Sequence, residues 1–460
     1  MRRIAAIALW IAASAAASVW LALSLDGDGR RVYLPGPTTS GHHQIEERCE
    51  LCHTAGDGVR QDACLGCHRE ELADADDSHA PEIFRDPRNA ALGRRIDASR
   101  CVTCHREHRP RQTAAMGVTV AASFCADCHD DVLTGRPSHA GFSRDGCAAT
   151  GCHNYHDNRA LSESFLADHL HEPDLAAQPT VPAVTRARPA GRPLVAADVD
   201  APPGSRPATA VNQWLASSHA RAGVRCTGCH GGARLAGAGP ASTVSAETRN
   251  QIMPDDPVGL PARAWTDHPG PAACAACHGS EVAGFESGKH GMRVAAGLPP
   301  MSPADARLPM TDEAAHRTLG CTSCHGAHDV DTRRAAVDAC LGCHADRHSL
   351  AYQGSPHHRR WLAEQRGAFW PGSGVSCATC HLPRVRRLDG GEPRVLVEHD
   401  QNAALRPVET MVRPVCAPCH GVDFSLAALA DPALVGRNFR SAPSAPSAAM
   451  ELVRHRKESP

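Results

Sequence analysis

Cysteine pairs followed directly by a histidine recur along this chain and define its chemistry. Residues 321–348 (CTSCHGAHDVDTRRAAVDACLGCHADRH) contain two such units, each followed within four residues by another histidine. Two thiols one helical turn apart can bond to the two vinyl groups of one haem, and the histidine after the second thiol then lies under the macrocycle as an axial iron ligand. The spacing therefore indicates covalently attached haem c.

The same unit accounts for every cysteine in the chain. All 22 cysteines fall into pairs, and the residue after the second cysteine of each pair is histidine. Zinc also binds Cys-x-x-Cys sequences, but zinc does not require a histidine at the next position of every pair. We therefore predict eleven haem c groups with their iron. The pairs are Cys49 with Cys52, Cys64 with Cys67, Cys101 with Cys104, Cys125 with Cys128, Cys147 with Cys152, Cys226 with Cys229, Cys274 with Cys277, Cys321 with Cys324, Cys340 with Cys343, Cys377 with Cys380, and Cys416 with Cys419. The proximal histidines are His53, His68, His105, His129, His153, His230, His278, His325, His344, His381 and His420.

The fifth motif is longer than the others. Its cysteines, Cys147 and Cys152, enclose four residues instead of two. We expect this longer loop to let both thiols reach the vinyl groups, because every other cysteine of the chain belongs to a haem motif.

Histidines outside the motifs are candidates for the second axial ligand of each iron. His328 and His348 lie about one turn beyond a proximal histidine, so neither can reach the opposite side of its own haem, and we expect each to bind a neighbouring haem. The supply of such histidines exceeds the number of irons, which favours two histidines on every iron. We expect His42, His79, His108, His139 and His156 or His169 in the first half. In the second half we expect His219, His268, His290, His316, His328 and His348, with His357 and His399 in reserve.

The composition favours a core built around haem. Aromatic residues make up 4% of the 460 residues, which is too few for an ordinary core of this size. The segments between motifs are short, polar and rich in turn residues. We therefore expect a mainly α-helical fold with extensive loops, a haem-packed core and little or no sheet. Nothing in the charge pattern suggests a nucleic-acid partner.

The distribution of motifs divides the chain. We predict an N-terminal membrane anchor or signal segment (1–25), a pentahaem module (33–172), a proline-rich linker (173–210), a hexahaem module (211–436) and a disordered tail (437–460). The linker carries neither cysteine nor histidine, so it is extended and semi-rigid, or it drapes over a haem domain and fills surface grooves. The tail is low in apolar residues.

The N-terminus predicts export. Residues 4–25 form an apolar run that would span roughly 33 Å as a helix, enough to cross a bilayer, and basic residues precede it. We favour an uncleaved anchor that places the body in the periplasm, on the outer face of the inner membrane. The alternative is a cleaved secretory signal and a soluble periplasmic protein.

The first half resembles the class III (tetrahaem) and related small multihaem cytochromes. The resemblance rests on His42 with two close motifs after it, on CVTCHREH and on CHNYHDN, and covers about 140 residues. It implies a compact, mainly helical electron carrier with two histidines on each iron.

The second half resembles the multihaem hydroxylamine oxidoreductase and nitrite reductase superfamily. The supporting residues are GKHG around His290, the double motif of residues 321–348, SPHH at His357 and VSCATCHLPR around Cys377. Those nitrite reductases carry lysine in place of the motif histidine on the catalytic haem, and here every motif ends in histidine. Those hydroxylamine oxidoreductases use a tyrosine beyond the last motifs, and no tyrosine follows Cys416. The resemblance therefore supports the haem arrangement more than catalysis.

Two functions remain open from the sequence. The first is an electron carrier without a catalytic residue, in which a chain of bis-histidine haems joins a membrane quinol-linked donor to an exported redox protein. The second is a reductase or oxidase that acts on a small nitrogen or sulfur compound at one five-coordinate haem. The ligand supply and the absent lysine and tyrosine signatures favour the carrier.

Overall fold

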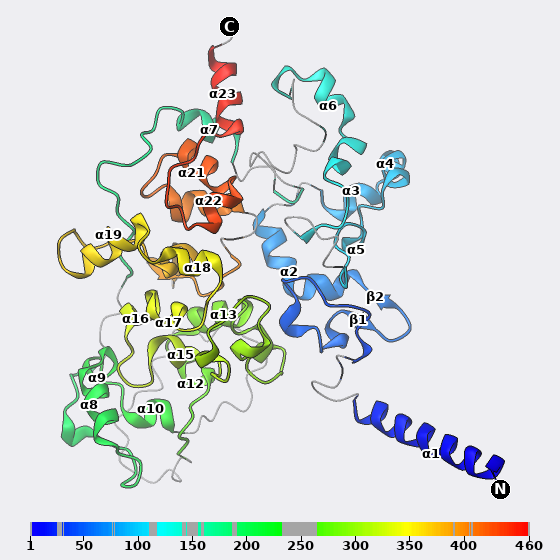
Figure 1. Cartoon of the computed structure of the whole chain (residues 1–460). Coiled ribbons are helices and arrows are strands. Elements are labelled where there is room, and N and C mark those ends of the chain that lie inside the picture. Colours follow the sequence, from blue (N-terminus) through cyan, green and yellow to red (C-terminus); the bar gives the residue numbers. More distant parts are fainter. Residues whose placement is uncertain are drawn as a thin grey trace. The chain divides into compact units, whose positions relative to one another are not determined.

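The computed structural model describes residues 2–24, 30, 32–75, 77, 79–109, 117–139, 144, 155–157, 161–185, 191–231, 265–389, 392–403, 405 and 408–458. Short helices and loops dominate these residues, and the only strands among them form two small hairpins (Figure 1). The fold is mainly α-helical with extensive loops, as the composition predicts.

The chain separates into two compact units. The first comprises residues 1–160 with 296–298, and the second comprises residues 161–295 and 299–460. Helices of the first unit are α1 (Arg2–Leu23), η2 (His43–Ile45), η3 (Cys49–Leu51), α2 (Gln61–Ala75), α3 (Pro81–Arg85), η4 (Pro87–Asn89), α4 (Ala90–Arg95), α5 (Cys101–Cys104), η6 (Ala122–Asp127), α6 (Asp130–Gly135) and η7 (Pro137–His139). Its strands β1 (His53–Thr54) and β2 (Gly58–Val59) pair antiparallel.

The second unit is built in the same way from short helices. These are α7 (Glu163–Asp168), η8 (Ala196–Asp198), α8 (Ala208–Ala216), α9 (Ser218–Arg221), α10 (Cys226–His230), α12 (Pro271–Ala275), α13 (Gly279–Ser287), α14 (Met292–Ala295), η9 (Pro303–Asp305), η10 (Asp312–Ala314), α15 (Cys321–His325), α16 (Thr332–Ala336), α17 (Asp338–Leu341), α18 (Arg347–Tyr352), α19 (Pro356–Gln365), α20 (Cys377–His381), η11 (Val408–Met411), η12 (Val412–Cys416), α21 (Val422–Leu429), α22 (Pro432–Gly436) and α23 (Ala448–Glu458). Strands β3 (Arg384–Asp389) and β4 (Glu392–Val397) form its antiparallel hairpin, with Arg384 opposite Val397.

Most helices are only one or two turns long, and several of them carry a haem motif or a paired histidine. Asp331, Asp346 and Ser355 cap α16, α18 and α19 by accepting hydrogen bonds from backbone N–H groups of the first turn. Such caps satisfy the free donors that a short helix would otherwise leave exposed. Local sequence chemistry therefore fixes these helices where long-range packing is sparse.

The proline-rich segment belongs to the second unit. The backbone N–H of Ala176 donates to the carbonyl of Cys419 over 2.8 Å, and that of Val181 donates to Gly372 over 2.8 Å. Further along, Leu194 donates to the carbonyl of Ala220 over 2.9 Å. The segment thus lies along the second unit, which matches the draped arrangement and not a free linker. Proline favours this extended backbone, and the N–H groups that remain find carbonyl partners in the loops beneath.

The C-terminal residues are ordered, whereas the sequence predicts a disordered tail from residue 437. Helix α23 buries Ala449, Met450 and Val453 almost completely, and it packs against α7. Apolar content averaged over the tail hides this face, because Met450 and Val453 lie on the same side of the helix at a spacing of three residues. The pentahaem module is predicted to end at residue 172, but the first unit ends at residue 160, because α7 belongs to the second unit.

Helix α1 is the N-terminal apolar run, and it extends as one continuous helix (Figure 1). Residues 3–23 have a mean hydropathy of 2.0 and are long enough to cross a membrane by length and composition. A cleaved signal sequence would have the same properties.

Candidate haem-binding sites

Helical turns set the geometry of the described motifs. The backbone N–H of His105 donates to the carbonyl of Cys101 over 2.9 Å, and that of His420 donates to Cys416 over 2.8 Å. In α15 and α20 the whole motif, from the first cysteine to the histidine, is one α-helix. Both thiols and the imidazole therefore start from one turn of backbone, as attachment to a single macrocycle requires.

The second cysteine of each described motif follows the same turn. The backbone N–H of Cys128 donates to the carbonyl of Cys125 over 3.2 Å, and that of Cys343 donates to Cys340 over 3.1 Å. Cys67 lies with Cys64 inside α2, one turn further along that helix. The thiol of Cys67 is exposed, and those of Cys128 and Cys343 are half-buried. No disulfide joins any of the described cysteines, so each thiol can serve for attachment to a vinyl group.

Each motif histidine that the structure describes faces a second histidine from elsewhere in the chain. The ring centroids of these ten pairs are separated by 5.9–6.5 Å. In the first unit the pairs are His53–His108 (6.5 Å), His68–His42 (5.9 Å), His105–His156 (6.3 Å) and His129–His79 (6.1 Å). In the second unit they are His230–His328 (5.9 Å), His278–His219 (6.0 Å), His325–His399 (6.3 Å), His344–His290 (6.2 Å), His381–His348 (6.0 Å) and His420–His357 (6.2 Å).

This separation fits an iron held between two imidazoles. A histidine nitrogen lies about 2 Å from a bound metal, and roughly 1.1 Å separates that nitrogen from its ring centre, so two ligands on opposite sides of one metal would have centroids about 6.2 Å apart. Direct ring stacking would bring the centroids closer, as for His420 and Phe424 at 4.8 Å. The spacing of the ten pairs therefore leaves the thickness of one metal-centred macrocycle between the rings.

Hydrogen bonds at Nδ1 orient many of these imidazoles. His108 Nδ1 lies 2.7 Å from the carbonyl of Gly36, His230 Nδ1 lies 2.7 Å from that of Thr266, and His348 Nδ1 lies 2.6 Å from that of Val435. A carbonyl only accepts, so Nδ1 carries the proton and donates it, which leaves the lone pair on Nε2. That is the tautomer that binds iron through Nε2.

Burial keeps several paired imidazoles neutral. It lowers the pKa of His290, His357 and His381 to about 4, and neighbouring histidines lower each of them further. Because a protonated imidazole cannot bind iron, these rings are ready to act as ligands at neutral pH.

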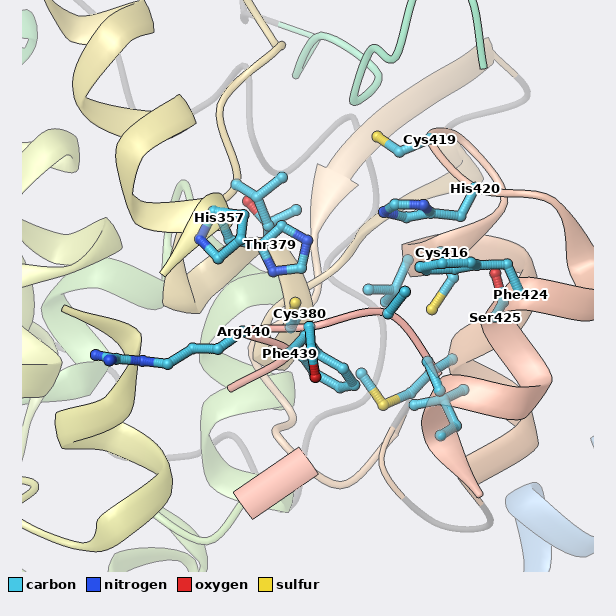
Figure 2. A pocket seen from close by; sticks show the side chains of 18 residues that line it. His357, Thr379, Cys380, Cys416, Cys419, His420, Phe424, Ser425, Phe439 and Arg440 are labelled. Atoms are coloured by element: carbon cyan, nitrogen blue, oxygen red, sulfur yellow. The ribbon is translucent and has the colours of Figure 1, made fainter. Parts of the chain in front are cut away.

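The last motif encloses the clearest cavity. A pocket of about 300 Å³ lies between α19 and the turn that carries Cys416, Cys419 and His420. Figure 2 shows His357 and His420 reaching toward it from opposite sides, with both cysteines on the side of His420. The rest of its wall is mostly apolar and includes Phe424, with Thr379, Ser425, Arg440 and Ser441 as its polar residues. This chemistry matches a macrocycle that is apolar apart from its iron and its two propionates.

Thiols of successive motifs lie next to one another. The thiols of Cys64 and Cys101 are neighbours, as are those of Cys274 and Cys321 and those of Cys340 and Cys377, because one thiol of each pair shifts the pKa of the other. At other junctions burial raises the pKa of one thiol and the charge of a thiol in the adjacent motif raises it further, for Cys52 beside Cys64, Cys229 beside Cys277, Cys324 beside Cys340, and Cys380 beside Cys416. The attachment points of consecutive motifs are therefore neighbours from the first motif to the third and from the sixth to the eleventh.

Tyr155 lies between the third and fourth sites. Its ring stacks on His79 with centroids 4.1 Å apart and meets His156 edge-on at 5.1 Å. The Nδ1 of His79 is also hydrogen-bonded to the carbonyl of Tyr155. One residue thus contacts a histidine of each of two sites and continues the series to the fourth motif.

Most of the predicted second ligands join a pair. These are His42, His79, His108, His156, His219, His290, His328 and His348, together with the reserve residues His357 and His399. In the double motif of residues 321–348, His328 and His348 each face the proximal histidine of a different motif, His230 and His381. The fifth motif, with Cys147, Cys152 and His153, lies outside the described residues.

Four predicted ligands belong to none of these pairs, and one of them is His139 at the end of η7. His268 and His316 are exposed and belong to none of the ten pairs. His169 donates from Nδ1 to the carbonyl of Phe165 over 2.6 Å, and its Nε2 lies 3.7 Å from a carboxylate oxygen of Glu172. His268 and His316 stand six and five residues before the first cysteine of a motif. The paired histidines of this kind, His42 and His219, stand seven residues before theirs.

His399 had no sequence signal beyond its residue type. It follows β4, whose pairing with β3 brings the chain back toward α20. The hairpin positions the ring 6.3 Å from that of His325. A recognised hairpin between the tenth and eleventh motifs would have favoured it.

Comparison with protein-family models matches residues 41–130 to the cytochrome c3 family. No curated protein and no solved structure matches the chain. The family match and the motifs together support a multihaem c-type cytochrome with covalently bound haem and iron. The match lies in the first unit, so the resemblance of the second half to hydroxylamine oxidoreductases stays a prediction.

Proposed function

We propose that this protein is an exported undecahaem cytochrome that carries electrons along a chain of bis-histidine haems. Haem bound at each motif supplies a one-electron ferric–ferrous couple. The observation that carries the proposal is the set of ten histidine pairs, in which every described motif histidine faces a second imidazole at the distance that an iron requires.

The pairing favours a carrier over a catalyst. A haem that reduces or oxidises a small molecule needs one axial position that the substrate can occupy. His357 and His420 line the pocket beside the last motif from two sides and would hold an iron between them, and both rings come from helical turns that hold them in place. A substrate would have to displace a buried imidazole to reach iron there.

The order of the motifs along the chain is the proposed order of electron transfer within each unit. Neighbouring thiols of consecutive motifs support this, because the vinyl edges attached to them would then be adjacent. In the second unit the series runs from Cys229 to Cys416 without a gap. The two ends of such a series are where redox partners would exchange electrons with the protein.

We place this chain in the periplasm with α1 as an anchor in the inner membrane. The helix is long and apolar enough to span the bilayer, and attachment of haem c requires export of the body. Its partners would be a membrane quinol-linked donor and an exported redox protein. If washed membranes release the protein only with detergent, the anchor is supported, whereas a mature N-terminus near residue 25 would rule it out.

Intact mass and ligand binding test the proposal. The mature chain should carry the mass of eleven haems, and the ferric protein should not bind cyanide at stoichiometric concentration. Ten haems with free thiols at Cys147 and Cys152 would refute the reading of the fifth motif. Rapid, tight binding of cyanide or nitrite to one haem would favour the reductase instead.

A further inference from the structure

We propose that the chain is a tandem of two equivalent five-haem units, in which equivalent haems take their second ligand from equivalent places in the sequence. Motifs one to five correspond to motifs six to ten, and the eleventh is an addition to the second unit. This inference rests on the bis-histidine ligation proposed above, and it assigns a ligand to the fifth haem.

The first haem of each unit takes its ligand from just beyond the third motif. His53 faces His108, which stands three residues after the proximal histidine of motif three. His230 faces His328, which stands three residues after the proximal histidine of motif eight. The offset is the same in both units.

The second haem of each unit takes its ligand from ahead of the first motif. His68 faces His42, seven residues before Cys49. His278 faces His219, seven residues before Cys226. Again the offset is identical, although the sequences between these residues and the haems they face differ in length.

The third and fourth haems follow the same order. The third, at His105 or His325, takes a histidine that lies beyond the fifth motif of its unit, His156 or His399. The fourth takes a histidine that lies between the second and third motifs. That residue is His79 opposite His129 in the first unit and His290 opposite His344 in the second.

The angles between paired rings repeat as well. The first-haem pairs are close to parallel, at 30° and 15°, and the second-haem pairs are steeply inclined, at 69° and 65°. The interplanar angles of the third-haem pairs are again small, at 19° and 36°, and those of the fourth-haem pairs are larger, at 86° and 48°. Sequence order does not dictate ring angles, so they support the correspondence independently.

The neighbouring thiols of different motifs also repeat between the two units. Cys64 and Cys101, which are neighbours, are the first cysteines of motifs two and three, and the neighbours Cys274 and Cys321 are the first cysteines of motifs seven and eight. Equivalent motifs therefore meet through equivalent atoms. Two unrelated haem arrays would have no reason to share both the ligand order and these junctions.

The correspondence singles out His139. In the second unit the fifth haem, at His381, takes His348, which lies between the fourth and fifth motifs of that unit. Its counterpart between motifs four and five is His139. His139 is therefore the sixth ligand of the haem attached at the fifth motif, and His169 and His171 are not. The pair His357–His420 has no counterpart, as an added haem requires.

Methionine substitutions in the full-length holoprotein test this assignment. Methionine opposite histidine gives ferric haem a far-red charge-transfer band that bis-histidine haem lacks. His348→Met is the positive control and should produce the band from one haem. His139→Met should produce the same band, while His169→Met and His171→Met should leave the spectrum of the parent protein unchanged. A band from His169→Met or His171→Met, or none from His139→Met with all haems retained, would overturn the correspondence.

A second variant covers the case in which His139→Met loses haem. His139→Gly should show one high-spin haem that added imidazole returns to low spin, and failure of imidazole to do so would also count against the assignment. The parent protein separates this test from that of the proposed function. A high-spin haem in the parent would contradict bis-histidine ligation itself, whereas a low-spin parent with an unresponsive His139 would contradict only the duplication.

Discussion

The ring centroids of His328 and His230 lie 5.9 Å apart, and the two rings are within 15° of parallel. His230 belongs to the sixth haem motif, whereas His328 follows the eighth. The same exchange recurs at the other described sites, where the second imidazole comes from outside the motif that attaches the haem. Each iron bound in this way would close a long loop of chain. Its haem would supply part of the apolar packing that the few aromatic residues cannot provide. The haems and the fold therefore depend on one another.

Replacing His328 with methionine should change one haem and leave the rest intact. Methionine opposite histidine raises the reduction potential of a haem, here by on the order of 100 mV within the range of about 0.8 V that axial ligands span. A potentiometric titration should show one haem moved to higher potential at an unchanged haem count. An unaltered titration would mean that His328 does not bind iron.

His268 and His316 provide matched controls on the same unit. Both are exposed and belong to no pair, so His268→Met and His316→Met should alter neither the absorption spectrum nor the potentials. A methionine charge-transfer band in either variant would return that residue to the ligand set. It would also show that the paired rings do not identify the ligands.

Helix α23 should contribute to the stability of the second unit. Met450 is fully buried where α23 packs on α7, so Met450→Ala should lower the free energy of unfolding by about 2–5 kcal/mol through lost burial and a cavity. Glu451→Ala, at an exposed position of the same helix, should have little effect. Thermal unfolding followed by far-UV circular dichroism measures both. Equal melting temperatures for the two variants would indicate that the tail is not packed.

Gly421 tests the position of the proline-rich segment over the last haem site. A Cβ at this residue would lie 2.8 Å from the carbonyl oxygen of Pro173, so Gly421→Ala must displace the segment. We expect a loss of about 1–3 kcal/mol, as for other overpacked sites. Gly436→Ala is the control, because a Cβ there meets no atom within 4 Å.

The displaced segment should also alter the haem attached at Cys416 and Cys419. Asp174 accepts a hydrogen bond from Nδ1 of His420 over 2.8 Å through its backbone carbonyl, and loss of that bond would lower the basicity of the proximal ligand. Redox titration of Gly421→Ala should therefore show one haem at a different potential. A variant as stable as the parent, with unchanged potentials, would place the segment elsewhere.

The motifs and most of the paired histidines could be predicted because haem attachment imposes strict local spacing. A histidine three residues after a proximal histidine, such as His108, cannot reach its own iron, and this argument from helix geometry leads directly to exchange between motifs. It does not identify the recipient, because that depends on how loops fold. His399 illustrates the limit, since its place is set by the β3–β4 hairpin. The exposed His316 illustrates the converse, because residue type and proximity alone do not bring a side chain to a site.

The tail and the proline-rich segment were less predictable for a related reason. Average composition describes neither well, because a few residues determine their packing. Met450 and Val453 suffice to dock α23, and a small number of backbone N–H groups, including that of Ala176, attach the proline-rich segment to the second unit. Such contacts depend on the shape of the surface beneath, which the local sequence does not specify.

Electron paramagnetic resonance of the fully oxidised, purified protein tests the central claim most directly. If every iron is held between two histidines, the spectrum contains only low-spin ferric signals, and excess cyanide leaves them unchanged. The near-parallel pairs, such as His230–His328, should give rhombic signals, and the steeply inclined pairs, such as His278–His219, should give the large-gmax type. A high-spin signal that integrates to one haem and disappears on adding cyanide would contradict the account.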